Sequence, residues 1–257
     1  MNINDRPPTN QQPVPRIEFR NVSLAYDDLV VLDDVSFKVW PAELLLLVGE
    51  SGGGKSTVIR LALGLDKTDS GVILIEGEDI TRLDEDELDR VREKMGVVFQ
   101  EGALFDSLSV FDNVAYRLED HGQDQPTIQR KVGDILKFVG LDDVADKLPA
   151  ELSGGMKRRV AIARALAAQP EAILYDEPTT MVDPIMSDHV GNLMLRLKRQ
   201  LKLTGVVVTH DLELMRKVAD TVVVLHEGKA IYFGPVADLE KSTHPHIQEF
   251  LAMDRVA

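Results

Sequence analysis

The feature that most constrains this fold is a glycine-rich loop between an apolar strand and a helix. Residues 44–48 form a continuous apolar run, residues 49–57 read G-E-S-G-G-G-K-S-T, and residues 57–65 have helical composition. The loop fits the pattern G-x-x-x-x-G-K-[ST], whose backbone N–H groups turn inward around phosphate oxygens. The following helix directs its positive end at the same oxygens. The segment therefore predicts a phosphate-binding strand, loop and helix within an α/β fold.

Each position of this loop has a predicted task in binding a nucleoside triphosphate. Lys55 supplies a mobile cation to the phosphates, and the Ser56 hydroxyl is placed to ligate Mg²⁺. We therefore predict ATP and Mg²⁺ as the cofactors. The residues predicted to bind the phosphates are Gly49, Ser51, Gly52, Gly53, Gly54, Lys55, Ser56 and Thr57.

Polar side chains follow three other apolar runs and complete the predicted catalytic set with Lys55. Asp176 and Glu177 are adjacent, and His210 and Gln100 come after separate runs. Ligands of α/β sheets bind at the carboxyl ends of strands, so these side chains should surround the same phosphates. We predict that Asp176 holds the metal, that Glu177 orients the attacking water and that His210 donates to the γ-phosphate. Gln100 offers an amide to the metal or the water.

Two kinds of strand pattern indicate the architecture. Alternating segments at residues 17–22, 35–39 and 71–75 predict an antiparallel β layer. Continuous apolar runs predict parallel strands buried on both faces, and they alternate with helical stretches, as in a doubly wound α/β sheet. The runs are residues 44–48, 97–99, 172–175, 206–208 and 222–225; the helical stretches are residues 57–65, 156–168 and 187–201.

The chain divides into a tail and one predicted domain. Residues 1–15 are polar and proline-rich and should form a disordered tail. The strand signal disappears over about residues 101–151, where residues 127–139 form an amphipathic helical pattern, so this part is a predicted helical subdomain inserted in the domain of residues 16–257. Residues 236–257 form a C-terminal segment.

Composition excludes several classes of partner and cofactor. The net charge of −14 would repel a phosphodiester backbone, so nucleic acid is not an expected partner. The chain contains no cysteine and therefore has neither disulfides nor thiolate metal sites. Its apolar runs are far shorter than the roughly 20 residues that cross a bilayer.

The segment Leu-Ser-Gly-Gly-Met at residues 152–156 adds an anion site without an obvious anion, because Ser153 is placed to cap a helix. The order and spacing of this segment, residues 49–57, Gln100, the Asp-Glu pair, Asp183 and His210 resemble the nucleotide-binding subunit of ABC transporters. The resemblance implies a P-loop NTPase (RecA-like) core. It also implies a head-to-tail dimer in which Ser153, Gly154 and Gly155 of one copy close over ATP held by the other.

The same resemblance suggests roles for two further residues. Asp183 matches the loop that couples the two nucleotide sites, although its neighbours Thr180, Met181 and Val182 depart from the more usual Ser-Ala-Leu. Tyr26 matches the aromatic residue on which adenine stacks. An alternative for Tyr26 is an aromatic ring in a hairpin that packs on the β layer.

Residues 101–115 are similar to the ATPase of the Mla/MCE phospholipid transporters, with Gly-Ala-Leu-Phe at residues 102–105 as the discriminating part. The resemblance implies an ATPase that lies peripherally on the cytoplasmic face of the inner membrane. It docks beneath a permease that works with an MCE-domain lipid carrier, and a STAS-domain protein often binds it. We therefore expect phospholipid transport, the alternatives being an ABC transporter for amino acids, phosphate or lipoproteins, or a non-transport ABC ATPase.

The apolar residues that follow Gln100 allow two interpretations. They could line a groove that receives a short helix of a permease, or they could fill the core of the helical subdomain. The sequence favours neither for the set as a whole. The residues are Ala103, Leu104, Phe105, Leu108 and Phe111.

Overall fold

The computed structural model describes residues 14–50, 52–100 and 102–253. The predicted tail therefore lies almost entirely outside the described residues, and so do Ser51 and Glu101. No helix in the described ranges is long and apolar enough to cross a membrane.

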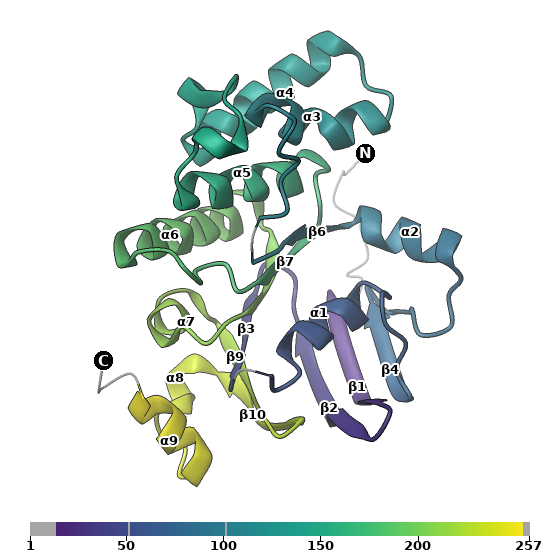
Figure 1. Cartoon of the computed structure of the whole chain (residues 1–257). Helices are drawn as coiled ribbons and strands as arrows, with labels where there is room; N and C mark the ends of the chain where they lie inside the picture. The colour runs from purple at the N-terminus through teal and green to yellow at the C-terminus, as the bar shows by residue number, and fades with distance from the viewer. Residues whose placement is uncertain (1–13, 51, 101, 254–257) are drawn as a thin grey trace, which may run out of the picture.

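A six-stranded sheet forms the centre of the molecule, in the order β10-β9-β3-β8-β7-β6 (Figure 1). Five strands pair in parallel, and β10 pairs antiparallel with β9 at the edge. All five predicted parallel strands are present, although β6 begins and ends earlier than the predicted residues 97–99, leaving Phe99 outside it. The strands are β3 (Leu44–Gly49), β6 (Met95–Val98), β7 (Ala172–Asp176), β8 (Thr204–Val208), β9 (Thr221–His226) and β10 (Lys229–Pro235).

The predicted antiparallel layer is a four-stranded sheet in the order β2-β1-β4-β5. β1 (Ile17–Tyr26) lies between β2 (Leu29–Val39) and β4 (Ser70–Ile75), and β5 (Glu78–Asp79) is a short edge strand. In β2, Val35, Phe37 and Val39 are buried while the residues between them are exposed, which is the pattern expected of a sheet with one face in the core.

The central strand β3 is buried on both faces, which accounts for its continuous apolar sequence. Leu44, Leu46 and Val48 belong to a core shared with α5 (Gly154–Ala167) and α6 (Pro184–Leu201). Leu45 and Leu47 belong to a second core shared with α1 (Lys55–Ala62) and the antiparallel sheet. Because successive side chains point to opposite faces, a strand covered on both faces has no position for a polar residue. The shorter α7 (Leu212–Val218) follows β8.

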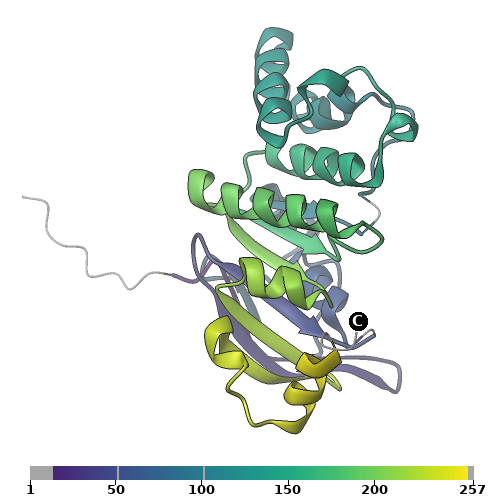
Figure 2. The same ribbon diagram turned by 90° about the vertical axis from the view of Figure 1, so that its left-hand side faces the viewer.

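The segment after Gln100 is helical, and it lies at the far end of the molecule from the antiparallel sheet (Figures 1 and 2). α3 (Val110–Asp120) is capped by Ser109 and α4 (Gln125–Val139) by Asp124. Gly140 ends α4 in the left-handed region with φ 70°. The short 3₁₀ turns η1 (Asp142–Val144) and η2 (Pro149–Glu151) then lead to α5.

The remaining helices lie near the surface. The acid-rich segment at residues 76–93 contains α2 (Glu85–Glu93), where Asp84 and Glu87 form a capping box and Leu88 and Val91 are buried. At the C-terminus, α8 (Val236–Leu239) and α9 (Pro245–Met253) follow β10.

Candidate nucleotide site

The loop between β3 and α1 has a backbone that only glycine accepts at two positions. Gly49 has φ 150°, and a Cβ there would overlap the carbonyl oxygen of Leu225 in β9. Gly54 has φ 87°, and its Cβ would lie 2.7 Å from the carbonyl oxygen of Val31. The chain can therefore leave β3, bend and enter α1 only with these residues.

Lys55 lies inside the loop. Its Nζ donates hydrogen bonds to the carbonyl oxygens of Gly49 at 3.0 Å and Glu50 at 2.7 Å, and the residue is only 6% exposed. Burial lowers the pKa of Lys55, and the nearby charges of Glu177, Asp176 and Glu50 partly oppose this shift. The ammonium is thus poorly solvated and surrounded by oxygens, which favours a strong interaction with an anion.

Ser56 and Asp176 meet at the carboxyl end of the sheet. The Ser56 Oγ donates a 2.9 Å hydrogen bond to the Asp176 Oδ1, which places two hard oxygen ligands side by side. Burial raises the pKa of Asp176, the bond from Ser56 opposes this, and Glu177 adds to it. No cluster of three or more His, Cys, Asp and Glu ligands occurs in the described residues. One hydroxyl and one carboxylate fit Mg²⁺, which usually takes few protein ligands and completes its shell with phosphate and water.

Glu177 and His210 form a pair beside Asp176. The His210 Nδ1 lies 3.0 Å from the Glu177 Oε2, and the Thr180 Oγ1 donates a 3.0 Å hydrogen bond to the same oxygen. Glu177 has φ 47°, an unusual conformation for this residue, and its N–H donates to the Val208 carbonyl oxygen at 2.9 Å. These contacts fix the carboxylate in one place despite the backbone strain.

One cavity of about 480 Å³ brings most of the predicted residues together. Gly53, Gly49 and Asp176 are outside its lining, although the Gly49 carbonyl oxygen holds Lys55 and Asp176 contacts Ser56. Thr180 and Val31 line the cavity and were not predicted. The lining residues are Tyr26, Val31, Gly52, Gly54, Lys55, Ser56, Thr57, Gln100, Glu177, Thr180 and His210.

Residues 152–156 and Asp183 lie outside this cavity. The Ser153 Oγ caps α5 by accepting the N–H of Met156 at 3.3 Å, and Ser153 and Gly154 are exposed. Asp183 caps α6 by accepting the N–H of Met186 at 3.0 Å. Gly155 packs against the side chain of Met186, where a Cβ would overlap it. Within one chain, the structure therefore does not bring this helix end to the phosphate cavity.

Two arginines of α5, the buried Arg158 and the half-buried Arg164, hold the segment around Gln100, a feature that the sequence did not reveal. Arg158 donates to the carbonyl oxygens of Phe99 at 3.0 Å, of Gln100, and of Thr180 at 3.2 Å. Arg164 donates to the carbonyl oxygens of Gly102 at 3.1 Å and Ala103 at 2.6 Å. The helix that begins at Ser153 is therefore tied to the strand end that carries Gln100.

The apolar residues after Gln100 divide between the two interpretations. Leu104 and Phe111 pack against the core that β3 shares with α5 and α6. Phe105 is exposed and, with Ala103, lines a groove of about 420 Å³. The core interpretation therefore holds for Leu104 and Phe111, whereas permease binding at Ala103 and Phe105 stays a prediction.

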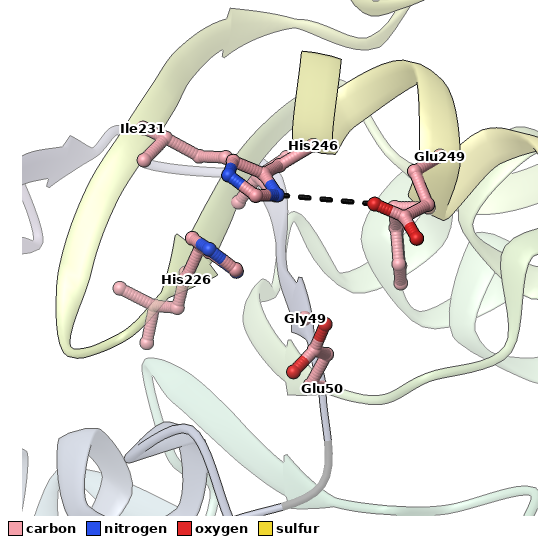
Figure 3. Close-up of a pocket in the computed structure, with 9 residues that line it drawn as sticks. Gly49, Glu50, His226, Ile231, His246 and Glu249 are labelled. Carbon is pink, nitrogen blue, oxygen red and sulfur yellow. Dashed lines mark ion pairs between the residues drawn. The ribbon is translucent and has the colours of Figure 1, made fainter. Parts of the chain in front are cut away.

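A second, small pocket is lined by Gly49 and Glu50, the residues that begin the loop, together with residues of β9 and α9 (Figure 3). The ring of His226, from β9, stacks on that of His246, from α9, with centroids 4.0 Å apart. The His246 Nδ1 lies 3.9 Å from the Glu249 Oε2, and Glu50 lines the same pocket. With a volume of about 20 Å³, it has room for about one water molecule and serves to pack α9 beside the loop.

Sequence comparison identifies related proteins along most of the chain. Residues 32–180 match the family model described as ABC transporter. The protein named methionine import ATP-binding protein MetN from Corynebacterium diphtheriae is 40% identical over 234 residues, which are 90% of this chain and 68% of that protein. Methionine import ATP-binding protein MetN 2 of Pseudomonas entomophila is 40% identical over 244 residues, covering 93% of this chain and 73% of its own length.

Structural comparison agrees with the sequence. The dimeric ATP-binding cassette MJ0796, solved in a post-hydrolysis state with ADP and phosphate, superposes with a TM-score of 0.79 at 31% identity, covering 86% of this chain and 98% of that one. CbiO1 from Clostridium perfringens, part of the cbiONQ transporter complex, gives a TM-score of 0.84 at 27% identity, covering 95% of this chain and 97% of its own. Family, fold and phosphate site agree: the chain belongs to the ABC transporter family as an ATP-binding cassette, an ATPase that uses ATP and Mg²⁺.

Proposed function

We propose that this chain hydrolyses ATP as a head-to-tail dimer and thereby drives a membrane permease. The observation that carries the proposal is that the N-termini of α1 and α5 lie apart within one chain. One helix end lies in a cavity with Lys55, Glu177 and His210, whereas Ser153 and Gly154 are exposed outside that cavity. A second copy, related by a two-fold axis, would bring its Ser153 to the phosphates held by Lys55. The dimeric form of the related cassette supports this arrangement.

The polar residues in and beside the cavity then have tasks in the reaction. Lys55 neutralises phosphate charge, and Ser56 and Asp176 would hold Mg²⁺, which stabilises charge on the transferred phosphoryl group. Glu177, held by Thr180 and adjacent to His210, orients the attacking water. His210 can donate a hydrogen bond to the γ-phosphate, and Gln100 offers its amide at the edge of the same cavity. Asp183, which caps α6, would contact the partner copy.

The groove that contains Phe105 is the proposed contact with the permease. It is lined by exposed apolar side chains, among them Leu65, Phe99 and Tyr116. Exposed apolar surfaces of this kind usually mark partners. Arg164 of α5 lines the groove and donates hydrogen bonds to the Gly102 and Ala103 carbonyl oxygens. Movement of a permease bound in the groove would therefore be passed to α5. The chain would lie on the cytoplasmic face of the inner membrane.

For the cargo, the relatives favour an amino acid over a phospholipid. The relatives described above are named for methionine import, so we propose an amino acid of this kind, the alternative raised by the sequence. The phospholipid expected from residues 102–105 finds no support in these names, and neither do the MCE-domain and STAS-domain partners. Phospholipid is kept as the second candidate cargo because Ala103 and Phe105 are exposed in the groove where a permease would be recognised.

A reconstituted transporter distinguishes the two cargoes. The complex would be purified from membranes with its own permease and placed in proteoliposomes with ATP. We expect ATP-dependent uptake of labelled methionine, absent when the ATPase carries Glu177→Gln. Movement of labelled phospholipid without amino-acid uptake would overturn the amino-acid cargo and leave the ATPase mechanism intact.

A further inference from the structure

A chain of hydrogen bonds fixes Tyr26, the aromatic residue that lines the nucleotide cavity. Tyr26 ends β1 where the hairpin turns toward β2, and it is 45% exposed. Its hydroxyl donates a 2.6 Å hydrogen bond to the Asp66 Oδ2, in the connection between α1 and β4. An exposed tyrosine would otherwise exchange between rotamers, so the bond restricts its ring.

Asp66 is in turn held by helix α1. The Arg60 Nε and Nη2 donate 2.7 Å hydrogen bonds to the Asp66 Oδ2 and Oδ1, a bidentate pair, and the Asp66 side chain is only 13% exposed. The hydrogen bond from Arg60 lowers the pKa of Asp66, and the hydrogen bond to Asp66 raises the pKa of Tyr26. These two pKa shifts keep the Asp66 carboxylate ionised as an acceptor and the Tyr26 phenol protonated as a donor.

The same helix begins the phosphate site. α1 starts at Lys55, and Arg60 lies in its last turn. A second carboxylate from the α1–β4 connection, that of Asp69, accepts the N–H of Ala25 at 2.7 Å and so fixes the backbone next to Tyr26. The aromatic ring and the phosphate loop therefore belong to one hydrogen-bonded unit.

We propose that Asp66 is a positioning residue for the nucleotide. With Arg60 it holds the Tyr26 ring at a set place relative to the helix that receives the phosphates, so that the base meets a preformed stacking surface. The gain is in affinity, because a ring already held in place loses less rotamer freedom when the base binds. The inference rests on the proposed ATP site and deepens it.

Nucleotide binding by three variants tests this role. Tyr26→Phe keeps the ring and removes the hydroxyl, Asp66→Ala removes the acceptor, and the double variant removes both. Each is expected to raise the Kd for ATP about three- to tenfold, the effect of one lost hydrogen bond. The double variant should be no weaker than either single one, and KM should rise more than kcat falls. Inorganic tripolyphosphate, which has no base, should bind unchanged.

Asp143→Ala, at an exposed carboxylate of η1, is the matched control and should leave ATP affinity unchanged. Three results would overturn the proposal: unchanged ATP affinity in Asp66→Ala, equal weakening of tripolyphosphate and ATP, or an effect of Asp66→Ala that persists in a Tyr26→Ala background. If Tyr26→Ala itself binds ATP normally, then the stacking role of Tyr26 is wrong. The phosphate site is tested separately by Lys55→Ala.

Discussion

The molecule contains two glycine-rich helix starts that differ in what surrounds them. At α1, side chains from the ends of neighbouring strands converge on the loop, and Lys55, Glu177 and His210 share one cavity. At α5, Ser153 is satisfied by the N–H of its own helix, and Ser153 and Gly154 face outward. A helix end becomes a strong anion site when other charges and donors converge on it. The first has its charged neighbours within the chain, whereas we propose that the second meets its anion on another copy.

Glu177→Gln is the change expected to have the largest effect on the α1 site. The amide keeps the size of the side chain but cannot act as a base or fix the water, so turnover should fall about 100-fold or more while ATP still binds. Phosphate release and equilibrium ATP binding would be measured on the same sample. The control Glu119→Gln, at an exposed residue of α3, should change neither phosphate release nor ATP binding. Normal turnover in Glu177→Gln would remove Glu177 from the mechanism.

Lys55→Ala should act on binding in the single chain. Loss of a charge-assisted contact worth roughly 1.5–3 kcal/mol corresponds to an approximately 10- to 150-fold weaker Kd for ATP. Fluorescence or calorimetry on the isolated chain would measure it, with Lys137→Ala at the exposed end of α4 as the control. Wild-type affinity and rate in Lys55→Ala would mean that the α1 site does not bind the phosphates.

On the stability of the nucleotide-free chain, Asp176→Asn should have a small effect in the stabilising direction. Burial raises the folded pKa of Asp176, so the native chain holds its proton more tightly than the unfolded chain. The resulting cost to stability is absent below the ordinary Asp pKa, grows as pH rises through that value and is complete above the raised folded pKa. In nucleotide-free protein at neutral pH, Asn should therefore raise Tm by about 2–4 °C for each kcal/mol recovered.

Thermal melts at neutral and acidic pH, without Mg²⁺ or nucleotide, check this prediction. The gain should shrink as pH falls toward the ordinary Asp value, while hydrolysis should be lost at every pH. A Tm that drops at neutral pH would show that the carboxylate stabilises the fold and that its charge carries no cost.

Local pattern predicted those parts of the fold and site that depend on neighbours in sequence. β3 was predictable because burial on two faces requires an unbroken apolar run. Asp176 was predictable because it ends such a run, and Ser56 because it belongs to the G-x-x-x-x-G-K-[ST] loop. β10 was missed because its residues are mostly half-exposed at a sheet edge. α2 was not predicted because its core contact is limited to Leu88 and Val91 in an acidic segment.

Contacts between distant segments could not be predicted in this way. Arg158 holds the carbonyl oxygens of Phe99 and Thr180, residues that come from different strand ends, and no pattern near Arg158 indicates them. The cargo could not be predicted either, because residues 102–105 gave an expectation of phospholipid that the names of the relatives do not support.

The central claim is that Ser153 acts on ATP bound to another copy, and the molar mass of Glu177→Gln in solution tests it most directly. Light scattering with and without ATP should show a chain of 28.5 kDa that doubles in mass only with ATP. Adding Ser153→Arg should return the protein to the monomer while ATP binding to the single chain is retained. A dimer that persists in the double variant, or a monomer in Glu177→Gln saturated with ATP, would contradict the account.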